Sequence, residues 1–465
     1  MNHTAPATDT DRPRTLLLRG GRVYSPADPF ATAMVVEGGR IAWVGSDGAA
    51  DSFADGVDEV VHLEDAFVTP AFTDAHVHST ATGLALTGLD LGAAGTLAEA
   101  LEHVRAHASA RPTDRVLLGT GWDATVWPEQ RHPTRAELDA ATGGRPLYLT
   151  RVDVHSALVS TALLDLVPGI TGLDGYASDA PLTGDAHHAA RATAHGSLTA
   201  VQRGEAQRAA LDHAASLGIG AVHECGGPDI SSEDDFTGLL HLAGTRSGPR
   251  VVGYWAGHVT SAKDAALIRD LGAVGAAGDL FADGSLGSHT AHLHAPYADA
   301  PHSTGTAHLD AADVAAHVAA CTEAGLQAGF HAIGDAALTA VTEGVRRAAE
   351  QVGTERVRAA RHRVEHAEML GEEAVAAFAA HALTASVQPA FDAAWGGERG
   401  MYARRLGADR ARTLNPYAAL LRAGVPLALG SDSPVTPLDP WGTVRAAAFH
   451  RTHGHRISAR AAFTA

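Results

Sequence analysis

The chain of 465 residues is poor in cysteine and in lysine, and each scarcity excludes a class of protein. Cys225 and Cys321 are its two cysteines, too few for a disulfide framework. Lys263 is its single lysine, and 35 Lys and Arg stand against 53 Asp and Glu, a formal net charge of −18. Nucleic acids and anionic membranes require clustered basic residues, so we expect neither as a partner.

Long apolar runs are missing as well. No run approaches the ~18–20 residues that span a bilayer. The first residues, MNHTAPATDTDRPRT, lack the apolar core of a signal peptide. We therefore expect a soluble, cytoplasmic protein whose partner is a small-molecule substrate. A homodimer is compatible with the sequence.

Residues 1–68 contain short β-rich runs separated by Gly, Asp and Pro. These runs are TLLLRGGRVYS, ATAMVVEGGR, RIAWVGSDG and VDEVVHLEDAFVTP. Their alternation of apolar and polar residues predicts a small antiparallel sheet, the N-terminal part of a small β-sandwich domain.

Residues 69–465 have the alternating helix and strand pattern of an α/β barrel. Ala-rich amphipathic stretches alternate after residue 210 with seven short apolar runs, and VTPAFTDAHVH makes an eighth. The seven are GIGAVHECGG, PRVVGYWAGH, GDLFADGS, GLQAGFHAIGD, VRAARHRVEHAE, LTASVQPAF and VPLALGSDSP. Eight such βα units are the number that closes a (β/α)₈ barrel of the TIM type.

Residues 82–210 interrupt this pattern after the first barrel strand. A segment of this length belongs on the rim of a barrel. It either covers the site as a lid or forms a peripheral subdomain with no catalytic part, and the sequence leaves both interpretations open.

Histidines are abundant, so a bare His-x-His triplet says little. The chain has 28 histidines, and three such triplets: His76/His78, His292/His294 and His453/His455. The first triplet differs because it ends an apolar strand. Residues two apart on a strand share a face, so both imidazoles can point into the mouth of the barrel.

Further polar residues end the later strands. They are Asp279 and Asp283 on the fourth, His331 on the fifth, Glu365 and His366 on the sixth, and Asp432 on the eighth. Catalytic groups of barrels lie at the C-terminal ends of strands. Imidazoles and carboxylates together suit Zn²⁺ or a similar divalent ion. Each of these residues could instead be an ordinary core, turn or cap residue, but four strands would then have to place ligands at one rim by accident.

The sequence motifs that contain these residues resemble the motifs of a known protein family. The order HVH, HAIGD, RVEHAE, GSDSP resembles the amidohydrolase superfamily of metal-dependent hydrolases. The longer phrases FTDAHVHS, GTGWDATVWPE, VDVHSALVS, FADGSLGSHTA and FHAIGDAAL resemble its YtcJ-like branch, which includes N-substituted formamide deformylase-like enzymes. The resemblance covers residue 14 to the end. It implies a barrel with a small β-sandwich and hydrolysis of an amide-like bond at one or two metal ions.

The resemblance also implies a ligand set. His76, His78 and Asp432 bind one metal, and His331 and His366 bind the second. Many relatives carry a carboxylated, bridging lysine on strand four where this chain has Asp279. That aspartate could bind both metals, bind one, or leave a mononuclear site.

One alternative for the site and one further difference from relatives remain. Glu224 or Cys225 on the second strand could reach the metal in place of Asp279. The chain stops at ISARAAFTA, where relatives continue through a last helix and the return strands of the sandwich. The sandwich is therefore expected to be incomplete, through either a shortened subtype or a truncation.

Hydrolysis of an amide requires an activated water, a polarised carbonyl and a proton for the leaving nitrogen. A divalent metal supplies the first two. Asp432 is the expected general base and acid, because it would touch both metal and water. Four residues on expected rim loops are candidates for substrate contacts: Trp122, Asp123, His155 and His289. Trp122 is equally compatible with a core aromatic of the insertion, and Gly334 and Asp335 of HAIGD fit a turn and cap.

Two rival functions remain open at this point. The same site could serve a deaminase or an ester or lactone hydrolase. A non-catalytic binding barrel is the second rival, favoured only by the aspartate at the lysine position.

Overall fold

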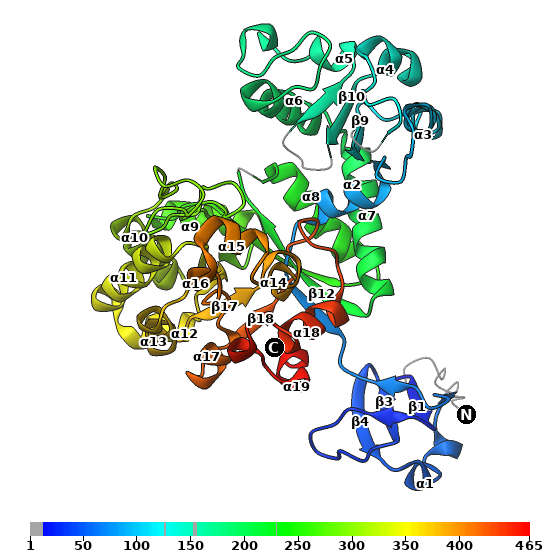
Figure 1. The fold of residues 1–465 in the computed structure, drawn as a ribbon. Helices are drawn as coiled ribbons and strands as arrows, with labels where there is room; N and C mark the ends of the chain where they lie inside the picture. The colour runs from blue at the N-terminus through cyan, green and yellow to red at the C-terminus, as the bar shows by residue number, and fades with distance from the viewer. Residues whose placement is uncertain (1–12, 125–126, 152–155, 229) are drawn as a thin grey trace, which may run out of the picture. The chain divides into compact units, whose positions relative to one another are not determined.

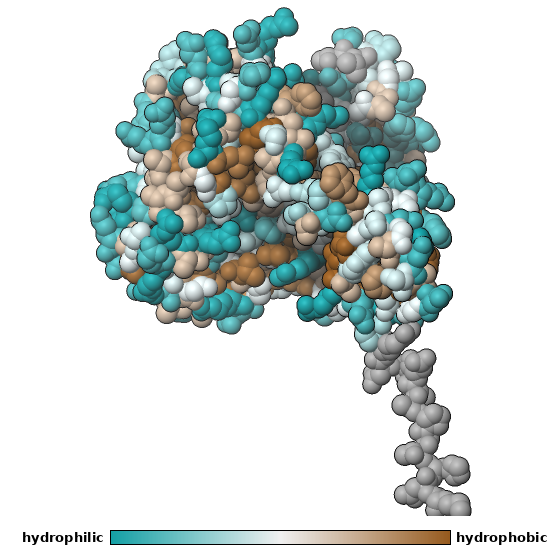
Figure 2. All heavy atoms as spheres, turned by 90° about the horizontal axis from the view of Figure 1, so that it is seen from below, coloured by the Kyte–Doolittle hydropathy of each residue, from teal (hydrophilic) through white to brown (hydrophobic). Residues whose placement is uncertain are grey.

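The computed structural model describes residues 13–124, 127–151, 156–228 and 230–465. The chain divides into two compact units, residues 1–71 and 72–465 (Figure 1). Within the described residues, no helix has both the length and the apolar character that crossing a membrane requires. Hydrophilic side chains cover much of the face seen in Figure 2, with hydrophobic side chains gathered in patches between them.

The first unit is built from two small sheets. Their strands are β1 (Thr15–Arg19), β2 (Arg22–Val23), β3 (Ala33–Glu37), β4 (Arg40–Gly45), β5 (Glu59–His62) and β6 (Phe67–Val68). The larger sheet has the order β4-β3-β1-β5, and β2 pairs with β6. The prediction of an antiparallel sheet is correct for β1 with β3 and β3 with β4, but wrong for β1 with β5 and β2 with β6, which are parallel. Helix α1 (Asp47–Ala50) lies in the crossover that a parallel neighbour requires.

The second unit contains a sheet of eight parallel strands, which confirms the predicted (β/α)₈ barrel of the α/β class. In chain order the strands are β7 (Phe72–Val77), β12 (Ile219–Gly226), β13 (Arg250–Trp255), β14 (Gly275–Ala276), β15 (Gln327–Ala332), β16 (Arg363–His366), β17 (Thr384–Val387) and β18 (Leu427–Leu429). Each pairs with its sequence neighbours in the sheet, as β/α units predict.

The barrel closes between the end of its first strand and the residues that follow its last strand. Val77 forms a parallel bridge with Ser433. The N–H of Asp432 donates to the carbonyl oxygen of His76 at 2.8 Å, and the N–H of His78 donates to that of Ser433 at 3.0 Å. One of these bonds therefore joins two predicted metal ligands, His76 and Asp432, and the other involves a third, His78.

The fourth strand differs from its prediction. The run GDLFADGS, residues 278–285, was expected to be extended, but β14 ends at Ala276. Gly278 has φ of +86°, in the left-handed region that ends an extended segment. Phe281 keeps one isolated bridge to His331, so the loop still runs beside β15.

Helices follow the strands and cover the outside of the barrel, as α10 (Ala311–Ala324) illustrates. Its first turn is capped by Asp310, whose carboxylate accepts from the N–H groups of Ala312 and Asp313. It ends at Gly325 in the left-handed conformation. Val314 and Val318 are fully buried in the main core between helices and strands.

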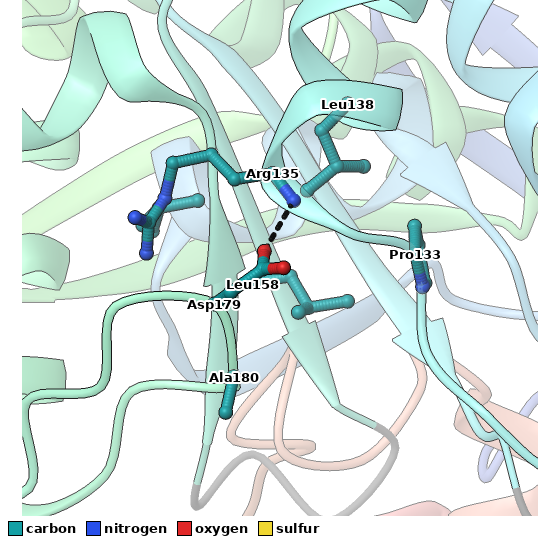
Figure 3. A pocket seen from close by; sticks show the side chains of 7 residues that line it. Pro133, Arg135, Leu138, Leu158, Asp179 and Ala180 are labelled. Atoms are coloured by element: carbon teal, nitrogen blue, oxygen red, sulfur yellow. Dashed lines mark hydrogen bonds between the residues drawn. The ribbon is translucent and has the colours of Figure 1, made fainter.

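The insertion after β7 folds around a sheet of its own, with the order β11-β10-β9-β8. Its strands are β8 (Leu89–Asp90), β9 (Leu117–Trp122), β10 (Leu147–Arg151) and β11 (Ala157–Val159). Figure 3 shows a small pocket in this subdomain, where the backbone N–H of Arg135 donates to Asp179 Oδ1 at 2.8 Å. The pocket is lined by Pro133, Arg135, Leu138, Leu158, Val159, Asp179 and Ala180.

Candidate metal centre

Strand β7 delivers the first two histidines of the site. His76 is fully buried and His78, one residue past the strand, has a side chain that is 12% exposed. Asp74 holds this strand end, because its Oδ1 accepts from the N–H of His76 at 3.2 Å and of Ser431 at 2.9 Å. Burial raises the pKa of Asp74 to about 6, against the lowering effect of these hydrogen bonds.

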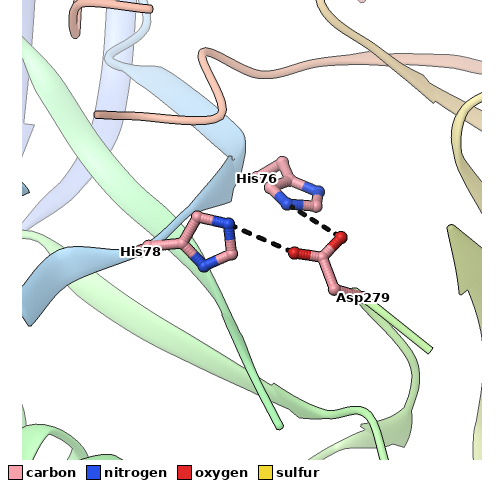
Figure 4. A group of neighbouring side chains, drawn as sticks. All are labelled: His76, His78 and Asp279. Carbon is pink, nitrogen blue, oxygen red and sulfur yellow. Dashed lines mark ion pairs between the residues drawn. The ribbon is translucent and has the colours of Figure 1, made fainter. Parts of the chain in front are cut away.

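Asp279 lies between two pairs of imidazoles. On one side its Oδ2 is 3.2 Å from His78 Nε2 and its Oδ1 is 3.5 Å from His76 Nε2 (Figure 4). On the other side the same Oδ1 is 3.5 Å from His331 Nδ1 and 3.7 Å from His366 Nε2. The position that relatives fill with a bridging lysine is therefore filled here by a carboxylate that faces four imidazoles.

Asp432, beyond the end of β18, completes the group. Its Oδ1 is 3.1 Å from His78 Nε2 and 3.5 Å from His76 Nε2. All six predicted ligands are thus brought together. Their ligand atoms lie within 4.8 Å of one another in three sets: His76, His78, Asp279; His76, His366, Asp432; and Asp279, His331, His366.

The rings of three histidines are fixed by hydrogen bonds on the side away from this centre. In each case the outer nitrogen donates, so the inner nitrogen keeps a lone pair that can bind a metal. The three bonds are His76 Nδ1 to Glu365 Oε2 at 3.0 Å, His366 Nδ1 to Gln388 Oε1 at 2.8 Å, and His331 Nε2 to the carbonyl oxygen of Gly284 at 3.2 Å.

The inner atoms fit a divalent cation. Within the described part of the chain, His76 Nε2, Asp279 Oδ1 and His331 Nδ1 are buried and have no hydrogen-bond partner. Buried polar atoms are costly unless they are paired or bind an ion. Two carboxylates and four imidazoles are a donor set typical of Zn²⁺ and similar ions.

The electrostatics of the group also favour a cation. Burial alone would raise the pKa of Asp279, but the neighbouring histidines hold it well below its usual range. Asp432 behaves in the same way, with His76 and His78 as the main partners. Conversely, the two carboxylates overcome burial and raise the pKa of His78 well above its usual value. The carboxylates are therefore ionised and attract positive charge to the centre.

Glu365 and His366 are neighbours in sequence, yet both reach the barrel interior. Successive residues of an extended strand point to opposite faces. His366 has φ of +66° and Ala367 has φ of +48°, so the strand leaves the extended conformation at this point. Positive φ at non-glycine residues is unusual and clusters at functional sites, and Asp432 shares it with φ of +55°.

The two alternative ligands on β12 take different positions. Glu224 accepts from the N–H of Ser79 at 2.9 Å. Cys225 is fully buried and forms a fourth close set with His76 and Glu365. Asp279, rather than Glu224, faces the imidazoles.

Three of the four candidates for substrate contact lie in the described residues, and each has a partner outside the ligand group. Trp122 is 3% exposed in the core of the insertion, and its indole N–H donates to the carbonyl oxygen of Leu149 at 3.1 Å. This placement favours the interpretation as a core aromatic. Asp123 is 3.1 Å from Arg151. His289 Nε2 is 2.9 Å from Asp299. His155 lies outside the described residues.

Arg363, Gln388 and Glu368 surround the ligands and were not among the residues that the sequence singled out, whereas Glu365 was. Arg363 is 3% exposed and Glu365 is fully buried on β16. The two residues stand two apart on a strand that was expected to be apolar. This spacing was the feature of the sequence that could have identified Arg363. Gln388 follows β17 and carried no such signal. Glu368 is 3% exposed, and burial raises its pKa to about 7.

Comparison with known proteins agrees with this geometry. The profile of the amidohydrolase family matches residues 59–464. The protein LONG AFTER FAR-RED 3 of Arabidopsis thaliana is 27% identical over 469 residues, which cover 93% of this chain and 77% of that protein. The putative amidohydrolase YtcJ of Bacillus subtilis is 26% identical over 463 residues, 93% of this chain and 83% of that protein. N-substituted formamide deformylase of Arthrobacter pascens is 33% identical over 148 residues, 31% of this chain and 27% of that enzyme.

A solved structure supports the same assignment. An uncharacterized metal-dependent hydrolase from Pyrococcus furiosus superposes with a TM-score of 0.79 at 25% sequence identity. The match covers 96% of this chain and 92% of that one. The barrel, the insertion and the N-terminal sheets are thus features of a known fold.

Proposed function

The chain belongs to the amidohydrolase family, and from this premise we propose that it hydrolyses a carbon–nitrogen bond of the amide type, in an N-formyl or N-acyl compound. The observation that carries the proposal is the position of Asp279 between two pairs of imidazoles, with Asp432 beside one pair.

The ligand set divides into two halves that share Asp279. His76, His78 and Asp432 would hold one divalent ion, and His331 and His366 a second. Zn²⁺ is the ion we propose. When bound, such an ion polarises a carbonyl oxygen and acidifies water.

The protein groups then have distinct tasks. Asp432 takes the proton of the attacking water and returns it to the leaving nitrogen, because its carboxylate lies at the centre and its backbone is held by the barrel closure. Glu365, Gln388 and the carbonyl oxygen of Gly284 keep the imidazoles oriented. Trp122, Asp123, His155 and His289 stay predictions for substrate contact.

The choice of an N-acyl substrate is supported by the match to N-substituted formamide deformylase, the relative named above with the highest identity. That match spans 148 residues, so it bears on the shared chemistry more than on the side chains that select a substrate.

The test is a substrate screen on zinc-reconstituted protein. N-formyl amines, N-acyl amines and N-acyl amino acids are compared with esters, lactones and aminated ring compounds, each with and without prior chelation. We expect turnover of at least one N-acyl class that disappears on chelation and returns with Zn²⁺. Turnover confined to esters, lactones or deamination would contradict the bond class, and metal-independent turnover would contradict the site.

A further inference from the structure

A buried ion pair lies directly behind His76. Arg363 and Glu365 of β16 point to the same side of the strand, and both Glu365 oxygens accept from the guanidinium, at 2.5 and 2.9 Å. The second of these oxygens also accepts from His76 Nδ1 at 3.0 Å. The three residues form a chain from guanidinium to carboxylate to imidazole.

Arg363 is held by strands on several sides of the barrel. Its guanidinium donates to the carbonyl oxygen of Ala75 on β7 at 2.7 Å, to Ser386 Oγ on β17 at 2.8 Å and to His223 Nδ1 on β12 at 3.1 Å. It also lies over the ring of Tyr254 on β13, 4.5 Å from the ring centre. These contacts fix the guanidinium, and through it Glu365, with little freedom to move.

The support of His76 differs in kind from that of its neighbours. Gln388 and the carbonyl oxygen of Gly284, which support His366 and His331, are neutral acceptors. A carboxylate acceptor forms a stronger bond to an imidazole N–H and makes the opposite ring nitrogen a better donor to a metal. His76 therefore has the strongest outer support of these three histidines.

The guanidinium also decides on which side of His76 a cation can lie. His76, Cys225 and Glu365 have ligand spacing of their own. Arg363 is already bound to that Glu365, so a second cation there would meet a fixed positive charge with little solvent to screen it. The side of Nε2, which faces Asp279 and Asp432, carries two carboxylates and, among the described residues, no paired guanidinium.

We infer that Arg363 and Glu365 are positioning residues that fix His76 with its Nε2 toward the metal centre and thereby tighten metal binding at the His76 half. This inference rests on the proposed function only in that it requires the centre to bind a metal. No step of substrate turnover enters it.

The test measures metal affinity and apoprotein stability separately. Zn²⁺ affinity is measured by competition with a chromogenic chelator, and thermal unfolding is measured on the chelated protein. The first variant is Glu365→Gln, which keeps the shape but removes the charge. The matched control is Asp235→Asn, the same change at a buried carboxylate that accepts from Thr80 and Gln207 outside the ligand group.

A second variant guards against misfolding. Glu365→Gln leaves the charge of Arg363 buried without a partner, which can destabilise the fold. The double variant Arg363→Met with Glu365→Gln removes both charges and is expected to fold. We expect both variants to bind Zn²⁺ about 10- to 100-fold more weakly at the tighter-binding of the two metal sites. The Zn²⁺ affinity of Asp235→Asn should equal that of the wild type.

The outcomes separate the inference from the proposed function. Wild-type affinity in the double variant would overturn the positioning role. Loss of folding in both variants would also overturn it and assign the pair to fold stability. Absence of Zn²⁺ binding by the wild-type protein would instead contradict the proposed function.

Discussion

The carbonyl oxygen of His76 accepts the backbone N–H of Asp432 at 2.8 Å. These residues are far apart in sequence, and this bond helps to close the barrel between its first and last strands. It brings the side chains of both residues to the same centre, where His76 Nε2 and Asp432 Oδ1 are 3.5 Å apart. The contact that closes the barrel therefore also brings these two side chains together.

Replacing Asp432 separates binding from catalysis. Asp432→Asn keeps an oxygen that can bind the metal but cannot accept a proton at neutral pH. We expect near-normal metal content and a loss of turnover of about 10²- to 10⁴-fold, the usual contribution of a general base. Metal analysis and kcat/KM on the same preparation check this, and undiminished turnover would disprove the assignment.

Replacing Asp279 is expected to affect the whole centre. Loss of residues that merely support a ligand costs 10- to 100-fold in metal affinity, so Asp279→Asn should lower Zn²⁺ affinity by more than about 100-fold. Asp283→Asn is the control, because that buried carboxylate accepts from the backbone N–H groups of His292, Ile333 and Gly334. It should lower stability and leave metal affinity intact. Equal affinity in both variants would show that Asp279 is not a ligand.

Gly430 tests the tight packing at the closure. A Cβ there would lie 2.7 Å from the backbone nitrogen of His76 and 3.2 Å from Asp74 Oδ1. Gly430→Ala is expected to lower the free energy of unfolding by about 1–3 kcal/mol and to weaken metal binding. In the control, Gly238→Ala on helix α8 (Glu233–Thr245), nothing lies within 4 Å of the new Cβ. Chemical denaturation measures both, and an unaffected Gly430→Ala protein would contradict the described closure.

Buried neutral histidines predict sensitivity to acid. Burial lowers the pKa of His317 to about 3 and of His362 to about 4. In the unfolded chain each titrates near 6.5. Between these values the unfolded chain binds protons that the folded chain cannot bind. Stability from these groups is therefore complete above pH 6.5 and falls as the pH drops toward 4.

The size of this effect is on the order of 1 kcal/mol per histidine between pH 6.5 and 5. Denaturant unfolding of the chelated protein across this range measures it. His317→Gln can retain the acceptor for Val259 N–H and the donor to Ala276 O, so its stability should fall less with acid. His302→Gln, at an exposed position, should follow the wild type. A His317→Gln profile identical to wild type would contradict the prediction.

The sequence predicted the parts of the fold that depend on local pattern. Strand alternation placed His76 and His78 on one face, and the repeated βα texture predicted eight parallel strands. Strand ends then indicated where His331, His366 and Asp432 would meet. These inferences succeed because a barrel brings every strand end to one rim.

Features that depend on pairing between distant segments could not be predicted from local sequence pattern. The parallel pairing of β1 with β5 is set by a crossover that leaves no alternating signal. The early end of β14 is set by the conformation of Gly278. The contacts of Arg363 join four other strands, and their register does not appear in any single stretch of sequence.

The most direct test of the account is a crystal grown with Zn²⁺ and measured on both sides of the zinc absorption edge. We predict an anomalous peak about 2.0–2.2 Å from His76 Nε2, His78 Nε2 and Asp432, and a second beside His331 and His366, with Asp279 between them. Absence of any peak within reach of these six residues, in protein that remains folded, would contradict the central claim.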